Sequence, residues 1–175
     1  MTVGGNVHFD PGDGTPGGLR VVSLSSGVTA SQTPTITAGA YTALDAVGGL
    51  LTFAEMARQS GGTIMVHTVT ITDLADAKAA LTLILFDRTF TATNDNAAFD
   101  PTDADLLNIV GIVPIAASDY GDFNDNAAAV KGNLGIVATL NGTSLFGQLY
   151  LPAGSAPTYA STSDLTVKVA AVRLT

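Results

Sequence analysis

From Thr33 to its C-terminus, the chain is a series of short segments rich in β-branched and apolar residues, separated by turn residues. The clearest segments are residues 63–72 (TIMVHTVTIT), 79–86 (AALTLILF) and 164–174 (DLTVKVAAVRL). Val, Ile and Thr favour strands, and several short strands with regular turn signals are typical of a sandwich or a barrel. The sequence therefore predicts an all-β fold. We expect an antiparallel β-sandwich of jelly-roll type, with a closed barrel as the alternative.

Individual segments add detail to this expectation. Residues 79–86 are apolar without alternation, which is typical of a central strand covered on both faces. Residues 164–174 alternate, so one face of that strand should be buried. Further strands are expected at residues 35–44, 50–54, 109–115, 133–140 and 143–151.

Turn residues mark the connections between these segments. Asn141-Gly142 lies between two apolar runs, and both residues tolerate positive φ, so the pair predicts a two-residue hairpin of type I′. Asp100 and Pro101 resemble the cap and first position of one short helix. Residues 73–78 are expected to form a turn, and residues 87–99 and 118–126 two polar loops.

The first 32 residues differ from the rest of the chain, because they are rich in Gly and Pro and contain few apolar residues. Glycine-rich segments are costly to order, so residues 1–32 are expected to form a flexible, extended N-terminal arm. Residues 33–175 are then a single β-sandwich domain, which is an ordinary length for one domain. One short strand in the arm could pair with a partner, and its candidate partner-binding residues are Leu19, Arg20, Val21, Val22 and Leu24.

Composition limits the classes of partner. The chain has 175 residues, a net charge of −8 and only 13% charged residues. With no basic stripe to neutralise phosphates, direct nucleic-acid binding is not expected. A low charge content leaves surface that partners could cover. No segment is apolar for long enough to span a membrane, and no secretory signal is visible, so we expect synthesis in the cytoplasm.

Candidate catalytic and metal-ligating residues are few. Asp100, Asp103 and Asp105 form one carboxylate cluster and Asp119, Asp122 and Asp125 another, so a Ca²⁺ site is conceivable. Neither cluster has the ligand spacing, glycine and distal Glu of a calcium loop, and turn and capping roles explain both. His67 has no accompanying zinc ligands and no nucleophile motif, so a strand position facing solvent or an interface is favoured. We expect no catalytic residue, no cofactor and no bound metal, and the chain is not expected to be an enzyme.

Four stretches carry a resemblance to a known family. They are residues 33–63 (TPTITAGAYTALDAVGGLLTFAEMARQSGGT), 71–87 (ITDLADAKAALTLILFD), 95–115 (DNAAFDPTDADLLNIVGIVPI) and 142–172 (GTSLFGQLYLPAGSAPTYASTSDLTVKVAAV). Together they resemble a family of small virion structural proteins of tailed double-stranded DNA bacteriophages. The resemblance covers most of the chain from Thr33 to Val172 and includes no catalytic signature.

The resemblance implies a function in the phage particle. It implies a capsid decoration (cement) protein, a jelly-roll homo-oligomer on the exterior of the virion head that binds the major capsid protein and stabilises the capsid lattice. A trimer is favoured over a dimer. The alternatives are a tail or neck structural component and a receptor- or glycan-binding module of the virion.

Overall fold

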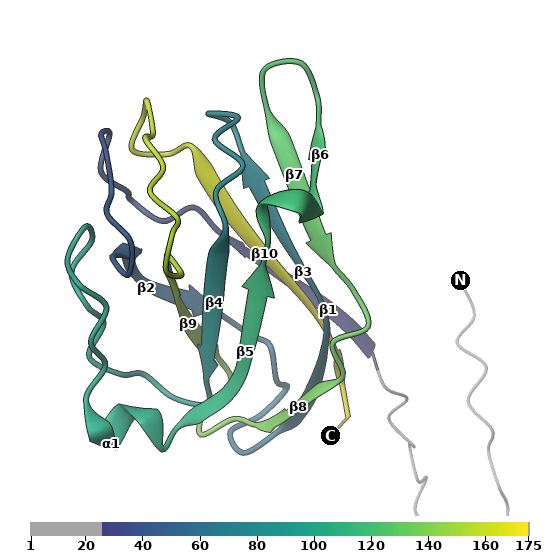
Figure 1. The fold of residues 1–175 in the computed structure, drawn as a ribbon. Helices are drawn as coiled ribbons and strands as arrows, with labels where there is room; N and C mark the ends of the chain where they lie inside the picture. The colour runs from purple at the N-terminus through teal and green to yellow at the C-terminus, as the bar shows by residue number, and fades with distance from the viewer. Residues whose placement is uncertain (1–25, 175) are drawn as a thin grey trace, which may run out of the picture.

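The computed structural model describes residues 26–174, which form ten strands, one short α-helix and one 3-10 turn (Figure 1). In chain order the elements are β1 (Ser26–Gln32), β2 (Ala46–Phe53), β3 (Thr63–Asp73), β4 (Leu81–Phe86), α1 (Asp103–Leu106), β5 (Ile109–Ile115), η1 (Ala117–Asp119), β6 (Tyr120–Asp122), β7 (Ala127–Lys131), β8 (Ile136–Thr139), β9 (Leu145–Tyr150) and β10 (Leu165–Arg173).

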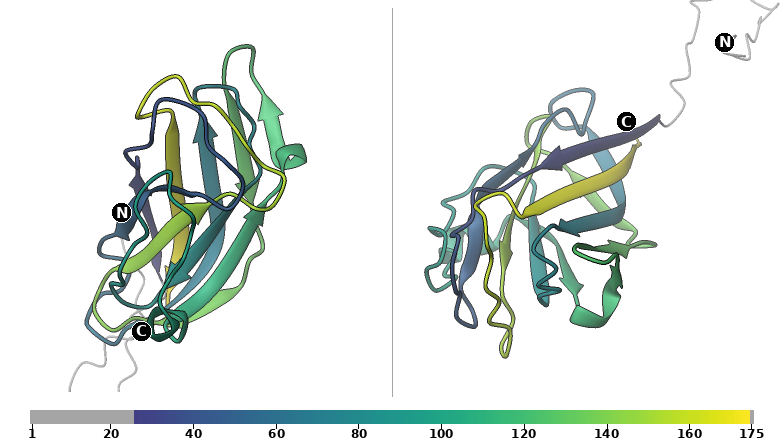
Figure 2. Two further views of the ribbon diagram at one scale, coloured as in Figure 1. Left: turned by 60° about the vertical axis from the view of Figure 1, so that its left-hand side comes forward. Right: turned by 90° about the horizontal axis from the view of Figure 1, so that it is seen from above.

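The strands form two antiparallel sheets that pack against each other as two layers (Figure 2). The six-stranded sheet has the order β1-β10-β3-β7-β6, and β8 also pairs with β3. The four-stranded sheet has the order β2-β9-β4-β5. Strands β7 and β8 share one edge of the long strand β3, with β7 along residues 69–73 and β8 along residues 63–66.

The pairing pattern is nested. The first strand pairs with the last (β1 with β10), the second with the last but one (β2 with β9), β3 pairs with β7 and β8, and β4 pairs with β5. Successive pairs alternate between the two sheets, which is the arrangement of a jelly roll. The predicted fold class, an all-β jelly-roll sandwich, is confirmed.

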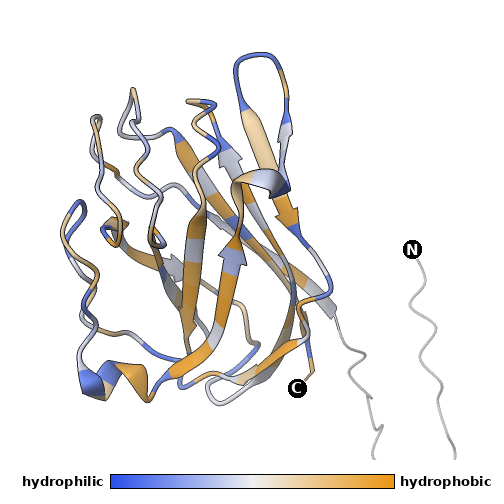
Figure 3. Cartoon of the chain, viewed as in Figure 1, coloured by the Kyte–Doolittle hydropathy of each residue, from blue (hydrophilic) through white to orange (hydrophobic). Residues whose placement is uncertain are grey.

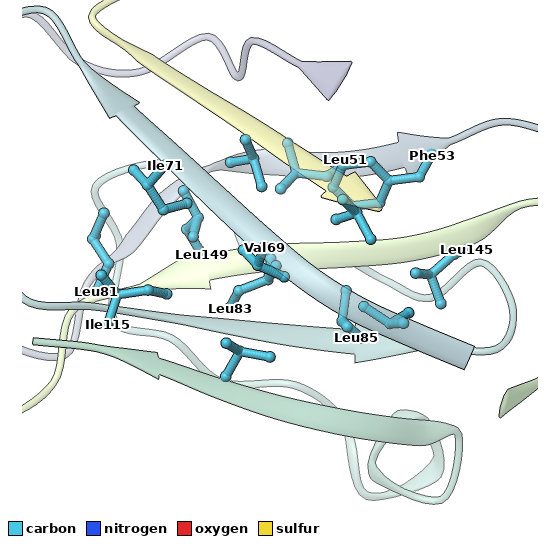
Figure 4. Packing of buried hydrophobic residues seen from close by; sticks show 14 of the residues in the cluster. Leu51, Phe53, Val69, Ile71, Leu81, Leu83, Leu85, Ile115, Leu145 and Leu149 are labelled. Carbon is cyan, nitrogen blue, oxygen red and sulfur yellow. The ribbon is translucent and has the colours of Figure 1, made fainter. Parts of the chain in front are cut away.

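The core lies between the sheets (Figure 4). Leu51 and Phe53 of β2 and Val69 and Ile71 of β3 project into it from opposite layers and are almost fully buried. Burying each such side chain contributes about 1.5–3 kcal/mol. In the middle of β9, a Cβ on Gly147 would lie 2.8 Å from the carbonyl oxygen of Ile84, so only glycine allows β9 to approach β4 this closely.

Several predicted elements are confirmed. Strands β3, β4, β5 and β10 lie where the β-type segments were expected, and all six residues of β4 are buried. The alternation in β10 is also confirmed, since Leu165, Val167 and Val169 are fully buried and Lys168 is exposed.

The strand predicted at residues 35–44 is wrong. This segment forms one isolated bridge, Ala40 with Thr158. It is held instead by single hydrogen bonds to the β9–β10 connection, from Ile36 N–H to Thr162 O (3.0 Å) and from Tyr41 N–H to Pro157 O (3.0 Å). Ile36 and Tyr41 of this segment are buried in the main core cluster, so their burial does not require a strand.

The predicted Asn141-Gly142 hairpin is also wrong. The flanking strands β8 and β9 belong to different sheets, β8 pairing with β3 and β9 with β2 and β4. Neither Asn141 nor Gly142 is among the residues with positive φ, so the turn is not of type I′. Long-range pairing decided the outcome here over the local turn preference.

The sheet begins before Thr33. Residues 26–32, which were expected in the flexible arm, form the edge strand β1 along β10. The helix is capped by Thr102, whose side chain accepts a hydrogen bond from the N–H of Asp105, and not by Asp100. Strand β7 was not expected, because its sequence AAAVK has no clear β signal.

Candidate interaction surfaces

The loop of residues 87–100 covers much of the outer face of the four-stranded sheet. Gln148 of β9 is fully buried beneath it. Its Nε2 donates to the carbonyl oxygens of Gly48 (2.9 Å) and Thr93 (2.6 Å), and its Oε1 accepts from Thr93 N–H (3.0 Å). Because the oxygen and the nitrogen of the Gln148 side-chain amide both have hydrogen-bond partners, Gln148 holds the loop in one position on the sheet.

Asp95 fixes the tip of the same loop. Its carboxylate accepts hydrogen bonds from Thr37 Oγ1 (2.6 Å), Tyr41 OH (2.6 Å) and Gly48 N–H (2.5 Å). Burial and the hydrogen bond to Asp95 both raise the pKa of Tyr41. The Asp95 carboxylate is therefore a structural acceptor that joins residues distant in sequence.

Aromatic contacts complete this cover. Phe90 of the loop stacks on Phe86 of β4 with ring centroids 3.9 Å apart, and Phe99 stacks on Tyr150 of β9 at 4.7 Å. The cover reaches the first residue of β5, Ile109, which packs against this cluster, but it leaves the middle of β5 exposed, since Ile112 is 56% exposed.

Exposed apolar side chains therefore lie at the end of α1 and in the middle of β5. We define the α1–β5 strip as Leu106, Leu107 and Ile112, of which Leu107 is 87% exposed. Figure 3 shows these hydrophobic segments beside the hydrophilic start of α1. Asp103 and Asp105 lie in the same short helix, so the strip has carboxylates at its border.

The outer face of the six-stranded sheet differs from the α1–β5 strip in its charge. Burial alternates along its strands, which identifies the side chains that face outward. We define the carboxylate-free face by the outward side chains of five strands. They are Thr29 and Ser31 of β1; Thr166, Lys168, Ala170 and Val172 of β10; Thr63, Met65, His67, Thr68, Thr70 and Thr72 of β3; Ala128 and Val130 of β7; and Val137 and Thr139 of β8. Among these side chains, Lys168 is the one lysine or arginine and His67 the one histidine. No carboxylate of residues 26–174 belongs to the face.

The predicted partner-binding residues Leu19, Arg20, Val21, Val22 and Leu24 lie outside the described residues. The strand that follows them, β1, is an edge strand: among residues 26–174 it pairs with β10 alone. It is anchored by Arg58, whose Nη2 donates to Ser26 Oγ (2.9 Å).

In each of the two predicted carboxylate clusters, one acid has a turn or capping role, and Asp122 of the second cluster pairs with Lys78 (3.1 Å). Asp105 accepts from Thr102 Oγ1 (2.7 Å). Asp119 accepts from Ala116 N–H (2.7 Å) and from Lys131 Nζ (2.9 Å), and the lysine lowers the pKa of Asp119. Within the described part of the chain, no three His, Asp or Glu side chains are grouped so that they could hold a metal ion.

His67 lies in β3, on the outer side of the six-stranded sheet, as expected of a strand histidine. It is half-buried, and its Nδ1 lies 2.8 Å from Thr68 Oγ1. The neighbouring Val66 and Val69 are both buried, so a bulge at residues 67–68 places His67 and Thr68 together at the surface.

Asp73 is a buried acid that the sequence analysis placed only in a turn. It is fully buried at the end of β3 and accepts hydrogen bonds from the N–H groups of Ala75 (3.0 Å) and Lys78 (2.8 Å). Burial raises its pKa. These backbone contacts close the turn between β3 and β4, so Asp73 organises this connection.

Sequence reasoning missed both surfaces. The α1–β5 strip reads as ordinary apolar residues, because only the position of the covering loop leaves Leu107 and Ile112 exposed. The carboxylate-free face had a partial signal in the Thr and Lys residues that alternate with Val in residues 164–174. That signal does not reveal which strands lie beside β10.

The described residues contain no helix long and apolar enough to cross a membrane. No protein-family model matches the chain, and no curated protein matches it either.

Proposed function

We propose that this chain is a bacteriophage virion structural protein, specifically a capsid decoration protein that binds the outer surface of the head. Two lines of support converge. Residues 33–172 resemble small virion proteins of tailed phages, and the same residues fold as a jelly roll, an architecture used in viral capsid domains. The fold is shared by proteins with other functions, so a specific surface must carry the proposal.

The observation that carries it is the α1–β5 strip. Leu106 and Leu107 are adjacent in the chain and both exposed, and neighbouring large apolar side chains at the surface are typical of interaction sites on soluble proteins. Leu107 and Ile112 are held on a short capped helix and on a sheet strand, so a partner can bind them with little loss of entropy. We assign this strip to contact with the major capsid protein.

Decoration of this kind acts by mass action. A protein that binds the assembled lattice and not the separated subunits stabilises the lattice in proportion to its occupancy. Many identical sites on one head add their contributions. The chain therefore needs a rigid body and a contact surface, and no reacting group.

The location and copy number of the chain in the particle test the proposal. Mass spectrometry of purified virions and cryo-electron microscopy of the head should show copies distributed over the head surface, in a fixed ratio to the major capsid protein. A few copies confined to the neck or tail would contradict decoration and support the tail or neck alternative. Binding of the isolated protein to host glycans would support the receptor-binding alternative.

A variant pair tests the assigned strip. Leu107→Arg should lower occupancy on undecorated heads, because it places a cation where apolar contact is expected. Leu74→Arg is the matched control, since Leu74 is an equally large exposed side chain in the turn after β3. Equal occupancy of both variants and the wild-type protein would contradict the assignment.

The N-terminal arm is a second proposed contact. Deletion of residues 2–18 and measurement of head binding test it, and unchanged occupancy would contradict a role for the arm.

A further inference from the structure

We propose that the carboxylate-free face is a self-association surface, through which two copies of the chain pack sheet against sheet about a twofold axis. This goes beyond binding to the capsid and holds for the isolated protein.

Charge is the first argument for a second copy as the occupant. Each chain has a net charge of −8, so two copies repel each other through most of their surfaces. Like charges placed opposite each other across an interface cost several kcal/mol. The carboxylate-free face is an exception, because two copies can meet there without opposing any carboxylate side chain of residues 26–174. The α1–β5 strip does not have this property, because Asp103 and Asp105 border it.

The size of the face is the second argument. The strands of the face, β1, β10, β3, β7 and β8, contain 36 residues. At about 3.3 Å along the strand and about 4.8 Å across it per residue, the face measures about 570 Å². This is near the lower end of standard stable interfaces, which bury about 600 Å² per partner.

The side chains on the face suit sheet-to-sheet packing. They are mostly Thr, Ala and Val, which are short and lose little rotamer entropy when covered. Val130 and Val137, on β7 and β8, are 62% and 59% exposed in the single chain. Two pairs of hydroxyls are already joined at the borders of the sheet: Thr33 with Thr166 (2.9 Å) and Thr63 with Thr139 (3.1 Å). The surface is therefore ordered before a partner arrives.

Lys168 is compatible with this packing. It lies on β10, with Ser31 of β1 on one side and Thr70 of β3 on the other. Its aliphatic stem can lie along the neighbouring threonines while the ammonium group reaches the border of the contact. Contact between two copies of the same face is isologous, and such a contact closes at two subunits. The proposed contact therefore predicts a dimer, and not the trimer expected from resemblance.

Sedimentation velocity of the full chain tests the proposal. The wild-type protein should sediment as a dimer of the 17.7 kDa chain. Val130→Arg should raise the dissociation constant about tenfold or more, because the twofold axis brings two added cations into the contact. Leu107→Arg is the control, since it adds the same charge at an exposed aliphatic residue outside the face and should leave the dimer intact.

A second pair of variants tests the face with an added negative charge in place of an added arginine. Lys168→Glu places carboxylates on the face and should weaken the dimer, whereas Arg88→Glu makes the same charge change at an exposed residue elsewhere and should not. Circular dichroism and thermal melting establish that each variant is folded.

Four results would overturn the proposal. The first is a monomeric wild-type protein at about 100 μM, a concentration at which even a dimer of micromolar affinity would be populated. The second is a trimer, and the third is a dimer weakened equally by the face variants and by their controls. The fourth is a dimer that is lost on deletion of residues 2–25 but is unaffected by Val130→Arg. The last result would show that the N-terminal segment, and not the face, joins the copies.

Discussion

At the scale of single residues, the structure depends on a few polar side chains that connect distant segments. Asp95 and Gln148 hold the loop of residues 87–100 on the four-stranded sheet, and Asp73 closes the turn after β3. Each accepts or donates several hydrogen bonds, so the loss of one side chain leaves several partner groups unsatisfied. The large effects of polar substitutions should therefore be found at these positions.

Asp95→Ala should lower the free energy of unfolding by about 2–4 kcal/mol, because the hydroxyls of Thr37 and Tyr41 and the N–H of Gly48 lose their shared acceptor. Urea unfolding followed by fluorescence measures the change. Asp125→Ala, at an exposed turn, is the control and should change stability by less than about 0.5 kcal/mol. A loss of stability of similar size in both variants would contradict the role given to Asp95.

Asp73 should give the stability a defined pH dependence. Burial raises its folded-state pKa above the usual value of about 3.9. A group whose pKa is raised on folding contributes stability that is fully present below the unfolded pKa and is lost as the pH rises through the folded pKa. Between pH 4 and pH 7, as ordinary assay limits, the wild-type protein should therefore lose stability relative to Asp73→Asn, which cannot ionise. Urea unfolding of both proteins across this range measures the difference, and a difference that does not change with pH would contradict the assignment.

At the scale of elements, β4 is the centre of the molecule. It lies between β9 and β5 in the four-stranded sheet, with the main core on one face and the residues 87–100 loop on the other. This double cover explains why its sequence, LTLILF, lacks alternation. The elements that carry surfaces, α1 and β7, are by contrast short and weakly marked in the sequence.

Leu83→Ala in β4 should lower the free energy of unfolding by about 2–5 kcal/mol, since it leaves a cavity at a fully buried site between the sheets. Leu107→Ala makes the same chemical change at an 87% exposed position and should cost less than about 0.5 kcal/mol. Thermal and urea unfolding of the pair provide the measurement. A small effect at Leu83 would mean that β4 is less tightly packed than the structure shows.

At the scale of the whole molecule, the nested strand pairs bring the first and last strands together. All ten described strands lie within residues 26–174, and β1 covers the edge of β10 along its length. The jelly roll closes with β1, so the folded body includes residues 26–32 as well as the part that follows Thr33. Its two broad surfaces, the α1–β5 strip and the carboxylate-free face, are formed by different sheets.

Two truncations test whether β1, residues 26–32, contributes to the stability of the folded body. Removal of residues 2–25 should leave the thermal midpoint nearly unchanged, because every described strand remains. Removal of residues 2–32 should lower it markedly, because β10 loses its partner β1 and the packing of Val28 and Ala30 on the core. Differential scanning calorimetry of both proteins tests this expectation. Equal midpoints would restore Thr33 as the start of the folded body.

Features that depend on residues close together in the sequence could be predicted, and features that depend on contacts between distant residues could not. Strands β3, β4, β5 and β10 were predictable because β-branched residues and hydrophobic alternation act within a few neighbouring residues. The jelly-roll sandwich followed from the number and spacing of such segments. The candidate surfaces were not predictable, because the exposure of Leu107 or Val130 depends on what other segments cover.

The amino-acid sequence by itself determined that this chain forms many short strands, carries few charges and places an uninterrupted apolar strand at its centre. Only the tertiary structure decided which strands pair, and therefore that Asn141-Gly142 passes between sheets and that Ile36 and Tyr41 are buried in the core without belonging to a strand. It also decided that no carboxylate side chain of residues 26–174 belongs to the outer face of the six-stranded sheet. The physical reason is that strand pairing and burial are contacts between residues far apart in the chain, whose energies outweigh a local turn or strand preference.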